Sequence, residues 1–254
     1  MRGCRRHFSY FLSFLNILMF RFAVIVLCET HLTADVDKGY NIPGYKQYNI
    51  YRSTFGGGIK IFYDELLNVE LIPALTFVRN YIEILTFSFY YNSINYIVSA
   101  IYRPPSANPN LFNDTLFNEI IDKYPTSYSS IIVGDVNFDL FNPMNHGYID
   151  EYIHSLLQFN YFPIITRPTR INDRVDFVIP FSLLDHIWVN FKRGCDHLAV
   201  VIKTTISDHY PILYIFKTLG PTVTKTIKYR LLKQNNLNQF YSKVNVESFD
   251  YIYI

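Results

Sequence analysis

The sequence predicts an α/β fold in which helices alternate with buried strands. Strand-like apolar runs occur at residues 94–102 and 130–133, and the segment 111–124 between them has helical spacing. A strand, a helix and a second strand in this order are typical of a βαβ unit. A second helical pattern follows at 148–159. The 254 residues suffice for one large domain or two small ones with a substantial core.

The composition sets limits on the class of protein. Charged residues make up only 17% of the chain, and the formal net charge of +2 is too small to indicate nucleic-acid binding by itself. Any contact with DNA must therefore come from a local basic face. Cys4, Cys28 and Cys195 are widely scattered, which fits neither a disulfide framework nor a zinc site. We expect buried or free thiols in a reducing compartment.

The N-terminal segment has two interpretations. Three arginines precede an apolar run over 8–20, as in a signal peptide, but Arg21 interrupts the run. The run is shorter than the roughly 20 residues that a membrane span needs. We favour a helix over 8–20 and a buried strand over 22–28, in an intracellular protein, nuclear or cytoplasmic, without stable membrane association. A signal peptide or anchor at residues 1–28 is the alternative.

Asp135 and Asn137 follow the buried strand that begins at Ser130. Gly134 adopts conformations closed to other residues, so the strand is expected to end there. In extended chain, residues two apart point to the same side, and ligands of open α/β sheets bind at this edge. A carboxylate and an amide there suit polarising a water and holding a phosphate oxygen. The alternative is an Asx turn after the strand.

Further polar residues also follow strand-like runs. Glu29 comes after the strand over 22–28 and is a candidate ligand for a hard cation such as magnesium; the alternative is a solvated loop acid or a helix cap. The prolines at 104 and 105 must break the strand, which places Tyr102 at its end and makes it a candidate site residue. The alternative is that Tyr102 is one of the many tyrosines that pack in the core. The three glycines at 56–58 fit a hairpin turn or a close approach of backbone to a ligand.

Asp208 and His209 form the second strongest candidate pair. A histidine that meets a carboxylate is a general base or a charged stabiliser. Asp185 would supply that carboxylate, with Asp173 and Asp176 as rivals. The other histidines that we considered are expected to be hydrogen-bonded structural residues: His31, His186 and His197.

Seven short motifs carry a resemblance to a known family. In chain order they are Glu-Thr-His-Leu, Arg-Ser followed by Gly-Gly-Gly, Tyr-Arg-Pro-Pro, Gly-Asp-Val-Asn-Phe-Asp-Leu, Thr-Arg-Pro-Thr-Arg, Leu-Asp-His-Ile and Ser-Asp-His-Tyr-Pro-Ile. The series resembles the endonuclease/exonuclease/phosphatase family. More narrowly, it resembles the apurinic-endonuclease-like domain of non-LTR retrotransposons, over roughly residues 20–216.

The resemblance implies a four-layer α/β/β/α sandwich of two packed mixed sheets flanked by helices. It divides the chain into a divergent helical segment over 1–21, the family-like domain over 22–216 and a basic linker-like tail over 217–254. It also implies a DNA-nicking endonuclease that uses Mg²⁺, with Mn²⁺ as a possible substitute. The implied roles are a metal ligand (Glu29), a phosphate-contacting tyrosine (Tyr102), an acid that orients or deprotonates the attacking water (Asp135), its phosphate-holding neighbour (Asn137), a carboxylate that orients the histidine (Asp185), an acid near the metal (Asp208) and a phosphate-binding histidine (His209).

The chain departs from the family at its start and at its end. The family opens with an Asn-bearing strand, for which Asn16 is a poor substitute, and the chain stops at Ile254 without a reverse transcriptase. We therefore expect an N-terminally truncated domain. A catalytically impaired remnant that at most binds nucleic acid is the alternative function. A phosphatase or phosphodiesterase for a small molecule or lipid comes third.

Overall fold

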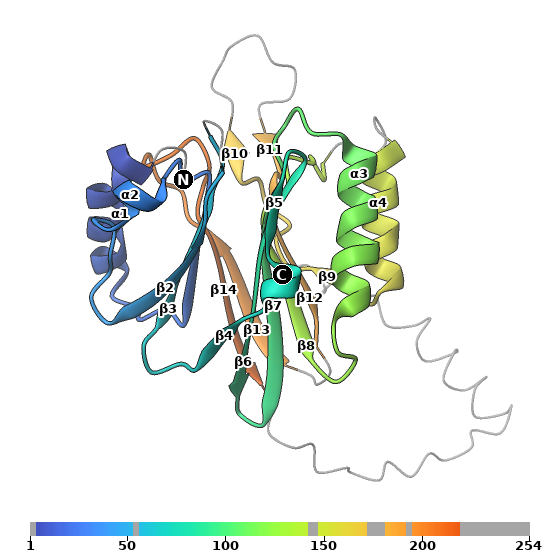
Figure 1. The fold of residues 1–254 in the computed structure, drawn as a ribbon, viewed down its shortest axis with the longest axis horizontal. Coiled ribbons are helices and arrows are strands. Elements are labelled where there is room, and N and C mark those ends of the chain that lie inside the picture. The colour runs from blue at the N-terminus through green and yellow to red at the C-terminus, as the bar shows by residue number, and fades with distance from the viewer. Residues whose placement is uncertain (1–3, 53–55, 142–146, 172–180, 192–194, 219–254) are drawn as a thin grey trace, which may run out of the picture. The chain divides into compact units, whose positions relative to one another are not determined.

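The computed structural model describes residues 4–52, 56–141, 147–171, 181–191 and 195–218 (Figure 1). The helices are α1 (Cys4–Leu18), α2 (Ala34–Asp37), α3 (Pro109–Asp114) and α4 (Gly147–Gln158), with short 3₁₀ or π segments at Pro73–Leu75, Thr115–Ile120 and Ile121–Lys123. The strands are β1 (Val24–Cys28), β2 (Tyr45–Ile50), β3 (Ile59–Asp64), β4 (Val69–Leu71), β5 (Phe77–Arg79), β6 (Ile82–Tyr91), β7 (Ile94–Tyr102), β8 (Ser129–Asp135), β9 (Phe162–Pro163), β10 (Arg170–Ile171), β11 (Phe181–Ser182), β12 (Asp185–Asn190), β13 (Cys195–Val201) and β14 (Ile212–Thr218).

The central sheet has the order β4-β6-β7-β8-β12-β9, with β5 also paired to β6. The pair β7–β8 is parallel, and the helical segment that begins with α3 connects its two strands, so the expected βαβ unit is present. The other neighbours in this sheet are antiparallel. The second sheet has the order β1-β3-β2. The hairpin β13–β14 and the short pair β10–β11 complete the strands.

Three hydrophobic clusters separate four layers, so the predicted α/β/β/α sandwich is confirmed (Figure 1). One cluster lies between α1 and the outer face of the β1-β3-β2 sheet, where Phe8 and Phe11 pack with Phe62. A second fills the space between the two sheets. The third lies between the central sheet and the helices α3 and α4, where Tyr152 packs edge-on against Trp188.

The predicted helices and strands are present with shifted ends. The helix expected over 8–20 spans 4–18, and the helix expected over 148–159 spans 147–158. The segment 111–124 does not form one regular helix, because a π-helical stretch and a 3₁₀ turn follow α3. None of the helices in the described ranges is long and apolar enough to cross a membrane.

Strand β1 lies at the edge of its sheet, and its only strand partner in the described part of the chain is β3. The hairpin β13–β14 packs on the same inter-sheet cluster but forms a sheet of its own. The segment before β1 is helix α1, which covers the outer face of the sheet rather than extending it. Of the expected tail over 217–254, all but Lys217 and Thr218 lies outside the described residues; these two end β14.

Candidate active site

Four polar side chains lie on one rung of the central sheet, which we call the polar rung. Glu83 of β6 is opposite Tyr102 of β7, Tyr102 is level with Asp135 of β8, and Asp135 is opposite Asp185 of β12. Residues directly opposite one another in a sheet project from the same face. Tyr102 belongs to the inter-sheet cluster, so the polar rung faces the second sheet.

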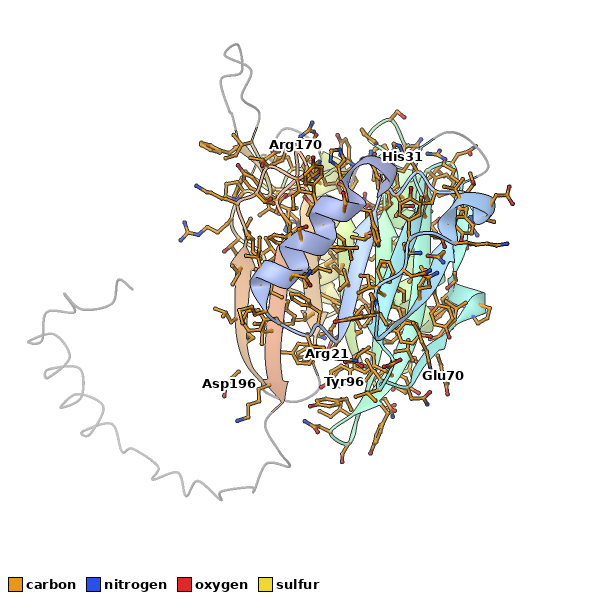
Figure 2. All side chains as sticks on the ribbon, turned by 90° about the vertical axis from the view of Figure 1, so that its left-hand side faces the viewer. Arg21, His31, Glu70, Tyr96, Arg170 and Asp196 are labelled. Carbon is orange, nitrogen blue, oxygen red and sulfur yellow. The ribbon has the colours of Figure 1, made fainter. Side chains whose placement is uncertain are left out.

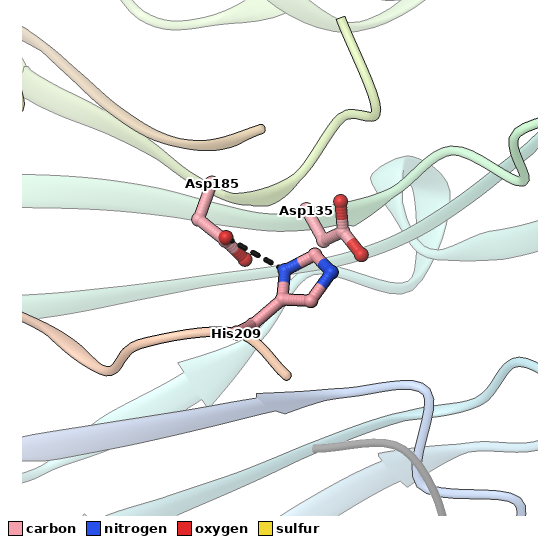
Figure 3. Close-up of side chains that lie close together, drawn as sticks. All are labelled: Asp135, Asp185 and His209. Atoms are coloured by element: carbon pink, nitrogen blue, oxygen red, sulfur yellow. Dashed lines mark hydrogen bonds and ion pairs between the residues drawn. The ribbon is translucent and has the colours of Figure 1, made fainter. Parts of the chain in front are cut away.

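Asp135 and Asp185 meet His209 at one end of the polar rung (Figure 3). The Nδ1 atom of His209 lies 2.8 Å from Oδ2 of Asp185, which favours the tautomer in which Nδ1 donates. Candidate ligand atoms of all three residues lie within 4.8 Å of one another. In Figure 3 the other ring nitrogen of His209 points toward the Asp135 carboxylate.

Burial and charge raise the pKa of Asp135 and that of His209 above their usual values. Asp135 is only 6% exposed, and burial followed by the charge of Asp185 raises its pKa to about 7. Burial lowers the pKa of His209, but the hydrogen bond and charge of Asp185 outweigh burial, so the pKa lies above its usual value. Near neutral pH the group therefore combines an acid able to accept a proton with an imidazole that readily carries one.

Glu29 reaches the same site through Tyr102. The Tyr102 hydroxyl donates a hydrogen bond to Oε1 of Glu29. Burial and then the Glu29 carboxylate raise the pKa of Tyr102, so this phenol stays a neutral donor. Glu29 is outside the Asp135–Asp185–His209 group, yet its charge contributes to the raised pKa of Asp135. Its backbone has φ +53°, a left-handed conformation that is unusual for a residue other than glycine.

Asn137 does not extend the strand as expected. Its φ of +53° turns the chain, and its backbone N–H donates to Oδ1 of Asp135 at 3.2 Å, which makes an Asx-type turn. The Asn137 side chain donates from Nδ2 to the carbonyl of Arg103 at 2.8 Å. The expectation that Asp135 and Asn137 point the same way in extended chain is therefore wrong. The amide joins the loop after β8 to the loop after β7.

The loop that carries Asp208 and His209 is held by the Thr-Arg-Pro-Thr-Arg segment. The N–H of Tyr210 donates to the carbonyl of Thr169 at 2.7 Å, and the Thr169 hydroxyl accepts from the N–H of Asp185 at 3.1 Å. Asp208 forms an ion pair of 3.0 Å with Arg170. Burial alone would raise the pKa of Asp208, but the charges of His209 and Arg170 outweigh burial. The pKa therefore lies below its usual value, and the carboxyl is ionised at neutral pH.

His186 has the structural role that the sequence suggests. Its ring is buried, with Nδ1 3.2 Å from the Tyr152 hydroxyl and Nε2 3.0 Å from the Phe138 carbonyl. Burial lowers the pKa of His186 to about 4. The rival acids Asp173 and Asp176 lie outside the described residues.

Glu83 is the member of the polar rung that the sequence did not predict. Its side chain is 0% exposed, and Oε2 accepts a 2.6 Å hydrogen bond from the N–H of Gly58. Oε1 lies 3.8 Å from a guanidinium nitrogen of Arg52. The available signal was a single acid at an inward position of an apolar strand.

The donors at this end of the sheets fit a hard divalent cation. Carboxylates are the preferred ligands of magnesium, and neighbouring acids, together with burial, raise the pKa of Asp135. A cation would offset this excess of negative charge. Asp185 already accepts from His209, and Asp208 is paired with Arg170. Glu29, which receives only the neutral Tyr102 hydroxyl among the hydrogen bonds described here, remains the strongest candidate ligand.

Comparisons with known proteins give matches among solved structures. No family model matches the sequence, and no curated protein does. The endonuclease domain of TRAS1, a telomere-specific non-LTR retrotransposon, is 13% identical, with a TM-score of 0.61 over 84% of this chain and 92% of that chain. The 3′ phosphatase NExo from Neisseria, bound to a product DNA hairpin, is 15% identical, with a TM-score of 0.62 over 85% and 96%. An AP endonuclease from Archaeoglobus fulgidus is 16% identical, with a TM-score of 0.61 over 85% and 96%.

At such identities the likeness concerns the arrangement of the chain rather than its chemistry. The match nevertheless extends over most of both chains in each comparison. The chain has the endonuclease/exonuclease/phosphatase fold.

Proposed function

We propose that this protein is a metal-dependent phosphodiesterase that nicks DNA. The observation that carries the proposal is the meeting of Asp135, Asp185 and His209 within 4.8 Å, at the end of the sheet where Tyr102 donates to Glu29. An acid able to accept a proton, a cationic imidazole and a carboxylate ligand are the groups that hydrolysis of a phosphodiester requires. The fold supports this class of reaction by analogy only.

In the proposed mechanism the residues of this chain divide the work. Asp135, with a pKa near neutrality, orients the attacking water and accepts its proton. His209, held by Asp185, donates a hydrogen bond from its cationic imidazole to a phosphate oxygen. Tyr102 and Asn137 contact the phosphate. Glu29 would hold the cation, with Asp208 as a second ligand in exchange for its ion pair with Arg170. Mg²⁺, or Mn²⁺ in its place, would supply charge compensation at the leaving oxygen.

DNA is the proposed substrate because of the neighbours' own ligands and names. NExo is seen with a product DNA hairpin, and TRAS1 is a retrotransposon whose similar domain is an endonuclease. The finer proposal is that this chain makes the nick that leaves a 3′-hydroxyl primer for a non-LTR retrotransposon, within the nucleus or cytoplasm.

A second candidate function is a catalytically impaired remnant that at most binds nucleic acid. The edge position of β1, beside a separate β13–β14 hairpin, favours this alternative. The backbone groups along an edge strand lack the ladder partners of a central strand, which weakens the support of a site built on its end.

The test is nicking of supercoiled plasmid with and without magnesium, on the parent and on Glu29→Gln. We expect the variant to lose magnesium-dependent cleavage, because an amide is a much poorer ligand for a hard cation. Binding of DNA should fall far less, since phosphate contacts come mainly from Arg and Lys. Glu70→Gln, an exposed change in β4, is the matched control. Unchanged cleavage by Glu29→Gln would show that Glu29 is only a loop acid, and a parent inactive under all metal conditions would favour the remnant.

A further inference from the structure

We propose that Glu83 is a positioning residue that fixes the Glu29 segment through the Gly57–Gly58 turn and thereby sets the metal affinity of the site. The inference rests on the proposed function, because it takes Glu29 as a metal ligand. It adds a residue that lies on the polar rung but has no part in the proposed mechanism.

A short chain of hydrogen bonds joins Glu83 to the segment that carries Glu29. Oε2 of Glu83 accepts from the N–H of Gly58 at 2.6 Å. The carbonyl of Gly58 then accepts from the N–H of Thr30 at 3.1 Å, and the carbonyl of Gly57 accepts from the N–H of His31 at 2.9 Å. Glu83 therefore fixes the Gly57–Gly58 turn, and this turn binds the backbone of Thr30 and His31, the two residues directly after Glu29.

The contact between Glu83 and the glycine turn is too close for any other residue. A Cβ atom on Gly57 would lie 2.1 Å from Oε1 of Glu83, and a Cβ on Gly58 would lie 2.7 Å from the Thr30 hydroxyl. Both glycines also have left-handed backbones, with φ of +68° and +89°. Only glycine at these two positions lets the backbone of the turn lie in direct contact with the Glu83 carboxylate.

The Glu29 segment needs such support. Glu29 and His31 both have positive φ, at +53° and +52°, a conformation that non-glycine residues keep only when their surroundings impose it. Glu83 is a costly support, since it is fully buried and its Oε1 has no hydrogen-bond partner in the described part of the chain. Arg52 at 3.8 Å offsets part of that cost. Buried polar groups of this kind are typical of functional sites rather than of stable cores.

The experiment measures binding of Mn²⁺ directly, from the electron paramagnetic resonance of the free ion, on four variants and the parent. The variants are Glu83→Gln, Glu83→Ala, Glu29→Gln and the control Glu70→Gln. Figure 2 shows Glu70 at the opposite end of the domain from His31. Melting temperature without metal is recorded for each protein, so that a loss of fold is seen separately.

We expect Glu83→Ala to raise the Kd for Mn²⁺ by roughly 10–100-fold, the range for residues that orient metal ligands. Glu83→Gln keeps an oxygen for the Gly58 N–H and should recover part of the affinity, with an unchanged melting temperature. A purely structural role predicts the reverse, a lower melting temperature with Mn²⁺ affinity intact in the folded fraction.

The outcomes separate the two proposals. If Glu29→Gln loses Mn²⁺ binding while both Glu83 variants bind as the parent does, the positioning role is overturned and the proposed function stands. If Glu29→Gln binds Mn²⁺ like the parent, or the parent does not bind it, the metal assignment fails and takes the inference with it. Should Glu83→Ala fail to fold, the Kd of Glu83→Gln for Mn²⁺ is compared with that of Glu70→Gln. A weaker affinity of Glu83→Gln supports the positioning role, and an equal affinity overturns it.

Discussion

Asp135 carries a conflict between stability and chemistry. Its folded-state pKa of about 7 lies above the ordinary value of 3.8, so its favourable contribution to folding is complete below pH 3.8 and is lost as the pH rises through 7. At pH 8, with a chelator present, Asp135→Asn should therefore have a free energy of unfolding that is higher than the parent's by on the order of 1–3 kcal/mol. The same substitution should abolish nicking.

Urea denaturation of Asp135→Asn and the parent at two pH values checks this prediction. At pH 5 the parent's Asp135 is already protonated in the folded state, so the gain should shrink. An equal gain at both pH values would mean that packing, and not charge, separates the two proteins.

His186 has the opposite pH dependence. Its folded-state pKa of about 4 lies below the ordinary 6.5, so its contribution to folding is present above pH 6.5 and is lost as the pH falls toward 4, by up to about 3 kcal/mol. In the Asp135→Asn background, the free energy of unfolding should fall between pH 6.5 and 4.5. Adding His186→Asn should flatten that slope while lowering stability throughout. A slope unchanged by this addition would assign the acid sensitivity to other groups.

The site residues differ in how far the sequence could predict them. The pairing of His209 with Asp185 was predicted with Asp173 and Asp176 as rivals, and the place of Asp135 in the same site was implied by the family resemblance. For Asn137 the alternative, an Asx turn, is the one present, and the sequence could not decide between it and an extended chain because Asn is compatible with both backbones. Glu83 gave only a weak signal, since its neighbours on the polar rung come from strands distant in sequence.

Among the elements, β8 depends most on one glycine. Gly134 has φ +150°, and a Cβ there would lie 1.8 Å from the carbonyl oxygen of Ile101 on the neighbouring strand β7. Gly134→Ala should lower the free energy of unfolding by more than about 3 kcal/mol, because the added Cβ meets backbone atoms of Ile101 and one of the two paired strands must move. Gly147→Ala is the control, since no atom of the described residues beyond its own chain neighbours and helix backbone lies within 4 Å of the added Cβ, and α4 begins there. Thermal melting and soluble yield report the difference, and similar values for the two variants would contradict the prediction.

The helical segment after β7 shows where periodicity stops being informative. Asn108 caps α3 by accepting from the N–H groups of Asn110 and Leu111, and Pro109 occupies the first helical turn. The apolar spacing predicted one helix over 111–124, yet Leu111 is exposed and a π-helical stretch follows. A π turn takes in one more residue than an α turn, and Phe117 within this stretch packs against Tyr152 of α4.

At the scale of the whole molecule, the edge strand β1 is the weak point. We predict that adding an Asn-bearing strand of the family type upstream of α1 improves solubility and nicking together, because it would give β1 a second neighbour. The two proteins would be compared at matched concentration by thermal melting and plasmid nicking. Robust magnesium-dependent nicking by the unextended chain would refute this and show that α1, packed on the outer face, is sufficient support.

The polar rung also dictates where the chain can change in length. The turn at Asn92–Ser93 joins β6 to β7 at the end of the hairpin away from Glu83 and Tyr102, so residues inserted there leave the pairing intact. A single deletion inside β7 or β8 would instead turn Tyr102 or Asp135 toward the helices, since successive side chains alternate between faces. Related sequences should therefore vary freely in length at that turn, whereas an insertion or deletion of one residue between Ser129 and Asp135 should abolish activity.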